Sequence, residues 1–424
     1  MDEALLHYIW KFQRYNTSNL TTTQNEPITI FHPGFHNFDS GPDFSDARLR
    51  VGNVQWAGHV EIHTTASDWQ KHRHHLDQAY ENVVLHVVYR ADEIITRKDG
   101  SAIPTLSLED RLPAELIDKH RSLIHTISPI PCDSQISSVQ PLVVASMVER
   151  ALTERLQEKS QLVLEILEKT RGDWEQATYA FVATALGMKT NANSFRDLAL
   201  SLPVDVIRKQ RSNRMQAEAL VFGIAGFLDY EPVDDYQKKL QDEFQFLFKK
   251  HQLPSKLNRH QWKFSKLRPA NFPTVRLAQL SAVLHAHPAL FQVLIGAQSY
   301  SEVKSILAAE PSIYWTQHYD FGKRTSRTIG AAGESAISSI VINAIVPLLF
   351  TYGKQVGNQE LVEKALDWLT SIPAEDNKIT RRWQAIHVRN SSAFDSQGLL
   401  QLSRQYCDRK KCLDCAIGNS LLSK

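Results

Sequence analysis

Residues 41–63, GPDFSDARLRVGNVQWAGHVEIH, constrain the fold most strongly, because they predict two neighbouring strands joined by a tight turn. Asp43 follows a Gly-Pro turn signal and therefore stands at the start of an extended segment. Residues 47–51 then alternate apolar and charged side chains, as a half-buried strand does. Gly52-Asn53 is typical of a hairpin turn, after which residues 55–63 return as the second strand.

The returning strand carries three ionisable side chains on one face, because His59, Glu61 and His63 are spaced two residues apart. Such a face is commonly exposed to water, so an ordinary solvated strand surface is one interpretation. The other interpretation is a metal site. In it, Asp43 and Glu61 share a divalent cation, His59 is a further candidate ligand, and His63 contacts a water bound to the ion.

These side chains leave the identity of the metal open. Carboxylate oxygens suit Mg²⁺ or Mn²⁺, whereas the histidines, His72 and His74 among them, could equally favour zinc or another transition metal. The run at residues 71–75, KHRHH, is expected on a surface helix, where contact with a metal or substrate competes with simple solvation. His86 alternates into an apolar strand and is expected to be a hydrogen-bonded core histidine.

The elements on either side complete an αβββαβ order. Apolar residues at helical spacing predict a helix over residues 2–15, and residues 27–31 read as a first strand. After the two central strands, residues 67–80 are expected to be helical. Residues 83–89 form the last strand of the order, and their near-continuous apolar character implies burial on both faces.

This αβββαβ order, with an aspartate opening the second strand and a glutamate on the third, resembles the restriction-endonuclease-like core of the PD-(D/E)xK nuclease superfamily. The matching letters are Pro42-Asp43 and Glu61-Ile62-His63. The resemblance implies that Asp43 and Glu61 bind Mg²⁺ or Mn²⁺, and Glu3 resembles the first-helix acid that some members add to the metal shell. His63 stands where the superfamily usually has a lysine that positions or activates the attacking water.

The resemblance therefore implies a metal-dependent nuclease that hydrolyses the phosphodiester bonds of DNA or RNA. His63 in place of lysine keeps a second interpretation open, a catalytically inactive nuclease-fold protein that binds nucleic acid or acts as a scaffold. At higher similarity, LLHYIW, HPGFHNFDSGPDF, WAGHVEIH and CDRKKCLDCAIGN resemble, over the whole chain, an uncharacterised bacterial family, number 2851 among the domains of unknown function. That family supplies no activity.

The remainder of the chain favours helices, which makes the expected fold class α+β overall. A length of 424 residues with 42% hydrophobic and 22% charged residues indicates a globular protein with more than one core. Long helices are expected at residues 142–169, 174–186 and 215–228. The expected organisation is a nuclease-like domain at 1–112, a linker at 113–141, a helical domain at 142–405 and a cysteine-rich segment at 406–424.

The location and the partners are predicted from charge and hydropathy. No run of eighteen apolar residues occurs and the N-terminus opens with two acids, so we expect a cytoplasmic protein without a membrane segment. Nucleic acid is the expected partner, and the oligomeric state stays open.

A basic stretch at residues 251–300 contains no acid and interleaves aromatic side chains with cations, a combination that suits stacking on bases and neutralisation of phosphates. The alternative is that the aromatics belong to the core and the cations to an ordinary surface. The candidate nucleic-acid-binding residues are Lys256, Arg259, Trp262, Lys263, Lys266, Arg268 and Arg276.

Cys407, Cys412 and Cys415 form a C-x4-C-x2-C pattern that could hold zinc or an iron–sulfur cluster. A fourth ligand is required, and Cys132, the one remaining cysteine, and His387 are the candidates. Some nucleases of the superfamily are similar in that an iron–sulfur cluster stabilises their core. One distant cysteine and three C-terminal cysteines bind that cluster, which favours Cys132 here. Reduced cysteines without a metal are the alternative.

Overall fold

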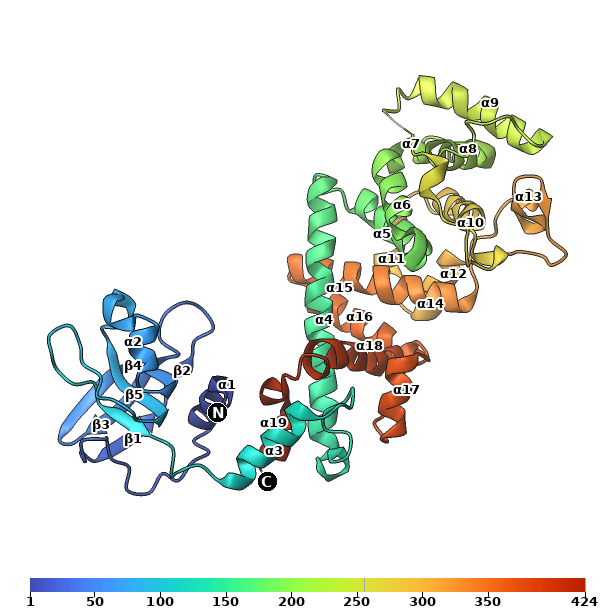
Figure 1. Cartoon of the computed structure of the whole chain (residues 1–424). Helices are drawn as coiled ribbons and strands as arrows, with labels where there is room; N and C mark the ends of the chain where they lie inside the picture. Colours follow the sequence, from blue (N-terminus) through green and yellow to red (C-terminus); the bar gives the residue numbers. More distant parts are fainter. Residues whose placement is uncertain (255, 424) are drawn as a thin grey trace. The chain divides into compact units, whose positions relative to one another are not determined.

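The computed structural model describes residues 1–254 and 256–423, and the chain divides into two compact units. Unit 1 is Met1–Met147 with Leu402–Lys424, and unit 2 is Val148–Gln401. The large sheet lies in unit 1 and most helices lie in unit 2, as the colours of Figure 1 show, so the α+β fold class is confirmed. The cuts at 147 and 401 lie a few residues from the expected boundaries at 141 and 405, and the C-terminal segment joins the N-terminal unit.

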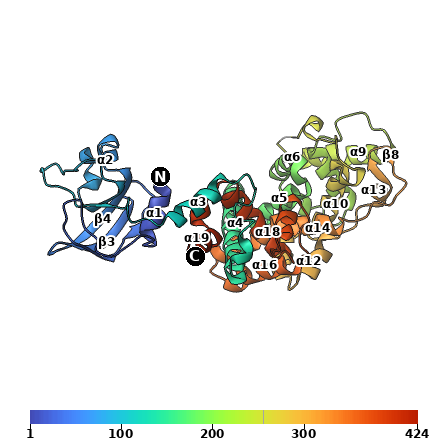
Figure 2. The ribbon, with the colours of Figure 1, turned by 60° about the horizontal axis from the view of Figure 1, so that its bottom comes forward.

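A mixed sheet forms the centre of unit 1. Its strands run in the spatial order β1-β3-β4-β5-β6, and β2 also pairs with β3. The pairs from β1 to β4 are antiparallel, whereas β4–β5 and β5–β6 are parallel. Figure 2 shows β3 and β4 side by side. The strands are β1 (Ile28–His32), β2 (Phe35–His36), β3 (Phe44–Val51), β4 (Val54–Thr65), β5 (Val83–Arg90) and β6 (Thr105–Ser107).

The predicted hairpin is present between β3 and β4. Val51 pairs with Val54 across the turn, where Gly52 has the positive φ of 57° that tight hairpin turns need. In β3 the apolar residues Ala47, Leu49 and Val51 are buried and alternate with exposed ones, as expected of a strand with one covered face. The parallel strand β5 is buried along its first six residues, which confirms the expected burial on both faces.

The helix expected over residues 67–80 is much shorter in the structure. Only α2 (Asp68–Lys71) is α-helical, and two 3-10 turns follow, η1 (His74–Leu76) and η2 (Gln78–Tyr80). Arg73 adopts a left-handed conformation with φ of 60°, which a continuing helix does not tolerate. The chain therefore turns back over the sheet directly after α2.

The first helix, α1 (Glu3–Lys11), packs on β4. The carboxylate of Asp2 caps it by accepting a hydrogen bond from the N–H of Ala4 at 3.2 Å. Its apolar residues, such as Ile9, are buried, while Glu3 and His7 are one turn apart on the same face. This packing brings two ionisable side chains of α1 to the sheet.

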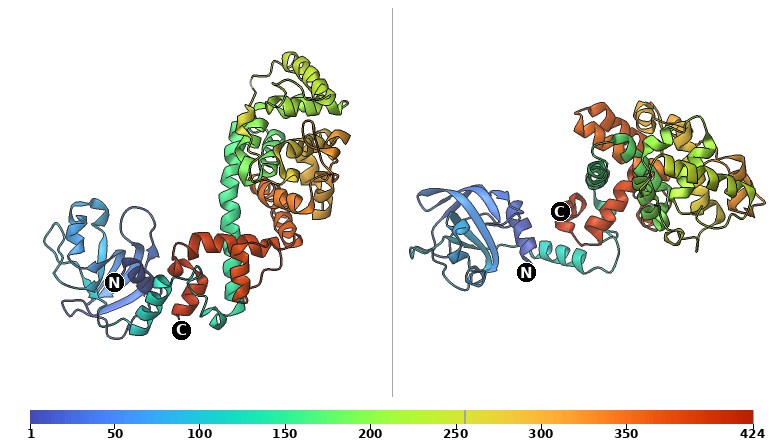
Figure 3. Two further views of the ribbon diagram at one scale, coloured as in Figure 1. Left: turned by 45° about the vertical axis from the view of Figure 1, so that its right-hand side comes forward. Right: turned by 90° about the horizontal axis from the view of Figure 1, so that it is seen from above.

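Both ends of unit 1 contribute to a smaller helical part, in which α3 and α19 are in contact although they are far apart in the sequence (Figure 3). The segment expected as a linker thus contains a regular helix. The elements here are α3 (Ala114–His125), η3 (Ile136–Ser138), η7 (Leu402–Cys407), η8 (Cys412–Asp414) and α19 (Ala416–Leu422).

Unit 2 is helical apart from the short hairpin β7 (His318–Asp320) and β8 (Lys323–Arg324). The helices predicted at 142–169 and 174–186 are α4 and α5, whereas the third, predicted to reach 228, ends at Ile224. Gly226 has φ of 77°, and a Cβ there would lie 2.1 Å from the carbonyl oxygen of Leu257, so the chain must turn at this point. The helices are α4 (Pro141–Lys169), α5 (Trp174–Leu186), α6 (Met188–Ser201), α7 (Val204–Arg208), α8 (Arg214–Ile224), α9 (Asp235–Lys250), α10 (Pro273–Ala286), α11 (Leu290–Gly296), α12 (Tyr300–Leu307), α13 (Ile313–Gln317), α14 (Glu334–Ile340), α15 (Val346–Gln355), α16 (Gln359–Ser371), α17 (Lys378–Ala385) and α18 (Ala393–Gln401).

Among the residues that the structure describes, one helical stretch, Glu334–Gln355, is long and apolar enough to cross a membrane by length and composition, and the bent pair α10–α11 would be a second if it were one span. The first stretch runs from α14 through the π-helical turn η6 (Val341–Ile345) into α15. Because 72% of its most apolar window is buried inside the protein, it has the character of a core helix.

Candidate metal centre

Asp43 and Glu61 are held side by side on neighbouring strands, as the sequence predicts. The backbone N–H of Asp43 donates to Oε2 of Glu61 at 3.1 Å, and the N–H of Ile62 donates to Oδ2 of Asp43 at 2.9 Å. The antiparallel pair Phe44–Val60 fixes this register between β3 and β4. Each carboxylate thus accepts a hydrogen bond from the strand that carries the other, so the backbone orients both acids.

Glu61 is the buried member of the pair, with 4% of its surface exposed. Its Oε1 lies 3.5 Å from Nε2 of His63 and 3.3 Å from Nε2 of His74. Burial raises the pKa of Glu61, and the nearby charge of Asp43 raises it further. A cation placed between these groups would therefore stabilise the ionised carboxylate.

His63 lies in a chain of imidazoles that starts in the core. Its Nδ1 is 2.8 Å from Nε2 of His86, and its Nε2 is 3.1 Å from Nδ1 of His72. His63 and His86 are 1% and 0% exposed. Burial, with the neighbouring imidazoles, lowers the pKa of His63 to about 2 and that of His86 to about 3. Both rings are neutral at pH 7, the state in which imidazole binds a metal, and the predicted core role of His86 is confirmed.

His63, His72 and His74 fit a metal ion together, because one ligand nitrogen from each lies within 4.8 Å of the others. With Glu61 beside them, the donors are nitrogen and carboxylate oxygen, a set that suits zinc or another transition metal better than Mg²⁺. His72 ends α2 and His74 opens η1, and the left-handed Arg73 between them turns both rings toward the sheet. Of the two interpretations of His72 and His74, a solvated surface and contact with a metal, the structure favours the second, because both lie within the group of three histidines.

Helix α1 adds Glu3 and His7 to the same region. Nε2 of His7 lies 3.2 Å from Oδ2 of Asp43. Burial alone would lower the pKa of His7, but this contact with the Asp43 carboxylate raises it overall. Glu3 is half-buried, and burial together with the charge of Asp43 raises its pKa. Glu3 thus interacts electrostatically with Asp43, and its place in a metal shell stays a prediction. His7 was missed, although its position four residues after Glu3 places it on the same helix face.

His59 lies outside the group of three histidines identified in residues 1–254 and 256–423. It is half-buried and pairs with Val83 of β5. Strands rise roughly 3.3 Å per residue, so His59 is about 6.6 Å from Glu61 along β4, on the side away from His63. His59 is therefore not one of the grouped histidines, and its role as a ligand stays a prediction.

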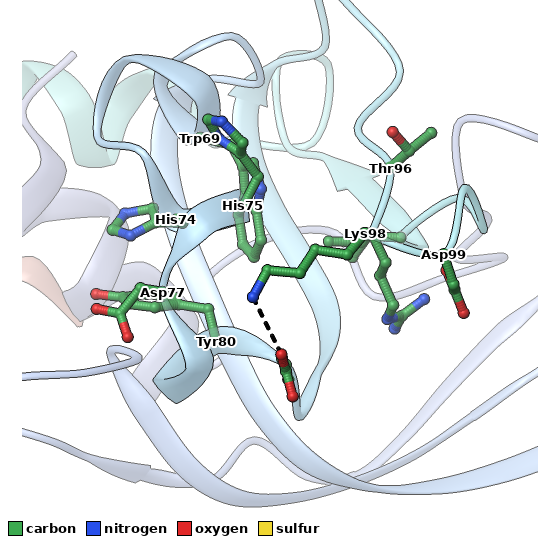
Figure 4. A pocket seen from close by; sticks show the side chains of 11 residues that line it. Trp69, His74, His75, Asp77, Tyr80, Thr96, Lys98 and Asp99 are labelled. Atoms are coloured by element: carbon green, nitrogen blue, oxygen red, sulfur yellow. Dashed lines mark hydrogen bonds and ion pairs between the residues drawn. The ribbon is translucent and has the colours of Figure 1, made fainter.

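A pocket of about 290 Å³ opens beside His74 (Figure 4). The ring of Tyr80 stacks on that of His74 with centroids 3.9 Å apart, and Trp69 lies on the same wall. Lys98, which forms an ion pair with Glu81 at 3.2 Å, lies across from them. Aromatic and cationic groups thus line a space next to the candidate ligands.

The basic stretch predicted to bind nucleic acid divides into exposed and buried residues. Trp262 is 5% exposed and its Nε1–H donates to the carbonyl oxygen of Ala225 at 2.8 Å. Arg276 is 7% exposed and donates to Asn271 and Gln279. These two residues belong to the core of unit 2, which corrects their prediction as a binding surface. The others are exposed or half-exposed: Lys256, Arg259, Lys263, Lys266 and Arg268.

The four cysteines come together in unit 1. Cys132, Cys407, Cys412 and Cys415 are all buried and line one small cavity. His387, the other candidate for the fourth ligand, is an exposed residue of unit 2. The structure thus brings Cys132 to the C-terminal pattern.

Comparisons with curated proteins and with solved structures gave no match. One family, described as "Protein of unknown function (DUF2851)", matches residues 3–378. This span contains all the candidate ligands of the metal centre and most of unit 2. The chain therefore belongs to this family of unknown function.

Proposed function

We propose that the protein is a divalent-metal-dependent nuclease that hydrolyses phosphodiester bonds of DNA or RNA. The observation that carries the proposal is the pair of carboxylates, Asp43 and Glu61, locked by reciprocal backbone hydrogen bonds at 3.1 and 2.9 Å. The order of helix and strands around them supports the resemblance to the PD-(D/E)xK superfamily. Glu3, in the first helix, supports it further through its electrostatic interaction with Asp43.

The residues that would hold the metal are Asp43, Glu61, His63, His72 and His74. A divalent cation at such a site supplies an activated water and stabilises the extra negative charge on the phosphate. With these donors, Mn²⁺ or zinc fits better than the Mg²⁺ that a purely carboxylate site takes.

His7 and His63 share the tasks of the lysine in related nucleases. His63 is buried and neutral, so it orients ligands and adds no positive charge. His7 has a raised pKa because it contacts Asp43. A protonated His7 would place one positive charge at the carboxylate pair, where it can donate a proton to a phosphate or to the leaving oxygen.

A second candidate is an inactive protein of the same fold that binds nucleic acid or acts as a scaffold. The burial of His63 favours it, because a ring that is 1% exposed and contacts two other imidazoles cannot move to a substrate. In either case nucleic acid is the proposed partner and the cytoplasm the proposed location. The exposed cations Lys263, Lys266 and Arg268 are the proposed contacts with phosphates.

The test is hydrolysis of single-stranded and duplex DNA and RNA with Mg²⁺, Mn²⁺ or zinc. Asp43→Asn and Glu61→Gln should each reduce cleavage to background, because each replaces a charged ligand by a neutral amide of similar shape. Asp46→Asn is the matched control, since this exposed residue has φ of 57°, which asparagine also adopts, and it should keep full activity.

Cleavage that survives in both ligand variants would come from a contaminant and would refute the nuclease. A wild-type protein that never cleaves but binds nucleic acid, with an affinity that falls as salt rises, would favour the second candidate. Replacing Lys263, Lys266 and Arg268 by alanine together should then weaken binding and reduce the salt dependence by roughly 0.7 to 0.9 per lost phosphate contact.

A further inference from the structure

The four cysteines of the chain converge from two stretches of sequence that are far apart, one around residue 132 and one at residues 407–415. Cys132 lies in the turn between α3 and η3, Cys407 ends η7, Cys412 opens η8, and Cys415 precedes α19. Each is 7% or 8% exposed, and none forms a disulfide. Sequence spacing accounts for the proximity of the three C-terminal cysteines only. The fourth cysteine, Cys132, lies far earlier in the chain, and it is the fold that brings it to the same place.

The four side chains line one cavity of about 20 Å³. Burial raises the pKa of Cys132 to about 12 and that of Cys412 to about 11, and the charge of neighbouring cysteines adds to the shift of each. A thiophilic cation in this cavity would meet sulfur ligands from both parts of the sequence, and its binding would release the thiol protons.

The backbone around the thiols is held close by contacts other than sulfur. A Cβ on Gly418 would lie 2.1 Å from the carbonyl oxygen of Cys412, so only glycine lets α19 close on η8. Nζ of Lys410 donates to the carbonyl oxygens of Thr126 and Ser128 at 2.9 and 3.3 Å. The C-terminal segment is therefore anchored beside the turn that carries Cys132, so that all four cysteines line one cavity.

We propose that Cys132, Cys407, Cys412 and Cys415 together bind a thiophilic metal centre, a single zinc ion or an iron–sulfur cluster. Both kinds of centre take four thiolates, with two of them at C-x2-C spacing. The centre is structural, because the thiolates enclose it and it ties the C-terminal segment to the turn after α3. It cross-links residues that are far apart in the sequence, which restricts the unfolded chain strongly. The proposal is independent of the histidine-containing centre and of any nuclease activity.

The experiment measures zinc, iron and acid-labile sulfide in the full chain purified without air, together with its visible absorption. Either one zinc per chain or iron with matching sulfide and a brown colour is expected, and these outcomes distinguish the two forms. The metal should be lost in each of Cys132→Ser, Cys407→Ser, Cys412→Ser and Cys415→Ser. It should be retained in His63→Ala, which removes a ligand of the other centre.

Leu123→Ala is the matched control for damage to packing, since Leu123 is 1% exposed and lines the same cavity without offering a ligand. It should keep the metal. If the cysteine variants fail to fold, titration of the wild-type protein with a mercurial thiol reagent gives the same answer, because metal release should follow modification of the four thiols. A protein that holds neither zinc nor iron after anaerobic reconstitution, or whose metal survives in the folded serine variants, overturns the proposal.

Discussion

Replacing His86 by leucine should weaken metal binding while leaving the fold nearly as stable as before. His86 itself is no ligand of the candidate centre. Its Nε2 contacts Nδ1 of His63 at 2.8 Å and so leaves Nε2 of His63 directed toward His72 and Glu61. His86 is thus a positioning residue, which acts on the metal through the orientation of the His63 ring.

The two energetic effects of His86→Leu on stability have opposite signs. The variant leaves Nδ1 of His63 buried without a partner, which costs about 1–3 kcal/mol. It also removes Nδ1 of His86, which is buried without a hydrogen-bond partner among the described residues, and so relieves a cost of the same size, about 1–3 kcal/mol. Because the two contributions offset each other, the free energy of unfolding should change by at most about 2 kcal/mol in either direction. Metal affinity should fall by about 10- to 100-fold, the usual effect of losing a residue that orients a ligand.

The assay is isothermal titration with Mn²⁺, an ion that prefers oxygen and nitrogen donors and so avoids the cysteine site. Urea unfolding of the same metal-free samples measures stability. His86→Gln is the matched control, because its amide can still pair with Nδ1 of His63, and it should bind within a few-fold of wild type. Unchanged affinity in His86→Leu would refute the role of His63 as a ligand. Equal losses in the glutamine and leucine variants would show that packing, and not the hydrogen bond, sets the affinity.

Three further predictions concern other parts of the fold. Burial raises the pKa of Glu218 above its unfolded value of 4.5, so stability falls as the pH rises from 4.5 through the folded pKa. Glu218→Gln should therefore gain stability over wild type above that range and none below it, as urea unfolding across pH will measure. Gly58→Ala should destabilise unit 1 by about 1–3 kcal/mol, because its Cβ would meet Cγ1 of Val84 at 2.5 Å, whereas Gly296→Ala, with open space around it, should be neutral or slightly stabilising. Trp262→Ala should cost about 3–5 kcal/mol by thermal or urea unfolding, and a variant that loses nucleic-acid binding at unchanged stability would contradict the core position of this ring.

The carboxylate pair could be predicted from the sequence because it depends on local rules. The alternation of residues 47–51 and the Gly52-Asn53 turn determine a hairpin, and a hairpin determines which residues are neighbours across it. The register at the turn, continued without a break, would place Asp43 opposite Ile62. The β-bulge between Phe44 and Ala47, where Asp46 has φ of 57°, shifts the pairing by one residue and brings Asp43 beside Glu61, a step that the turn alone does not predict. The predicted α+β fold class rests on the same kind of local evidence, repeated over the helices of unit 2.

The histidine group could not be predicted in the same way. His72 and His74 reach the centre because Arg73 is left-handed, and arginine gives no sequence signal for that conformation. The sequence therefore predicted a surface helix for the KHRHH run and left contact with a metal as one of two alternatives. Cys132 was named as a candidate fourth ligand only through the resemblance and beside His387, since its place near the C-terminal cysteines depends on how α3 and α19 pack.

The basic stretch shows that composition alone does not tell which side chains point to solvent and which point into the core. A row of cations and aromatics is the same in composition whether the aromatics point outward or inward. Helix α10 is buried along Pro273–Leu284, and Arg276, which lies within this stretch, is buried with it. Apolar residues around the whole circumference of this helix were the available signal for a core position.

The geometry around His63 bears on what the change from lysine does. A lysine at this position would extend a flexible charged group to the substrate, whereas His63 is fixed between His86 and His72 and has no freedom to reach outward. Its Nε2, 3.5 Å from Oε1 of Glu61, is instead directed at the same point as the carboxylate. In the proposed centre, a histidine at this position would add a nitrogen donor beside the carboxylates, which favours ions later in the Irving–Williams order over Mg²⁺. The metal preference of hydrolysis is therefore the most direct evidence on this residue: an enzyme that works best with Mg²⁺ would mean that His63 takes no part in binding the ion.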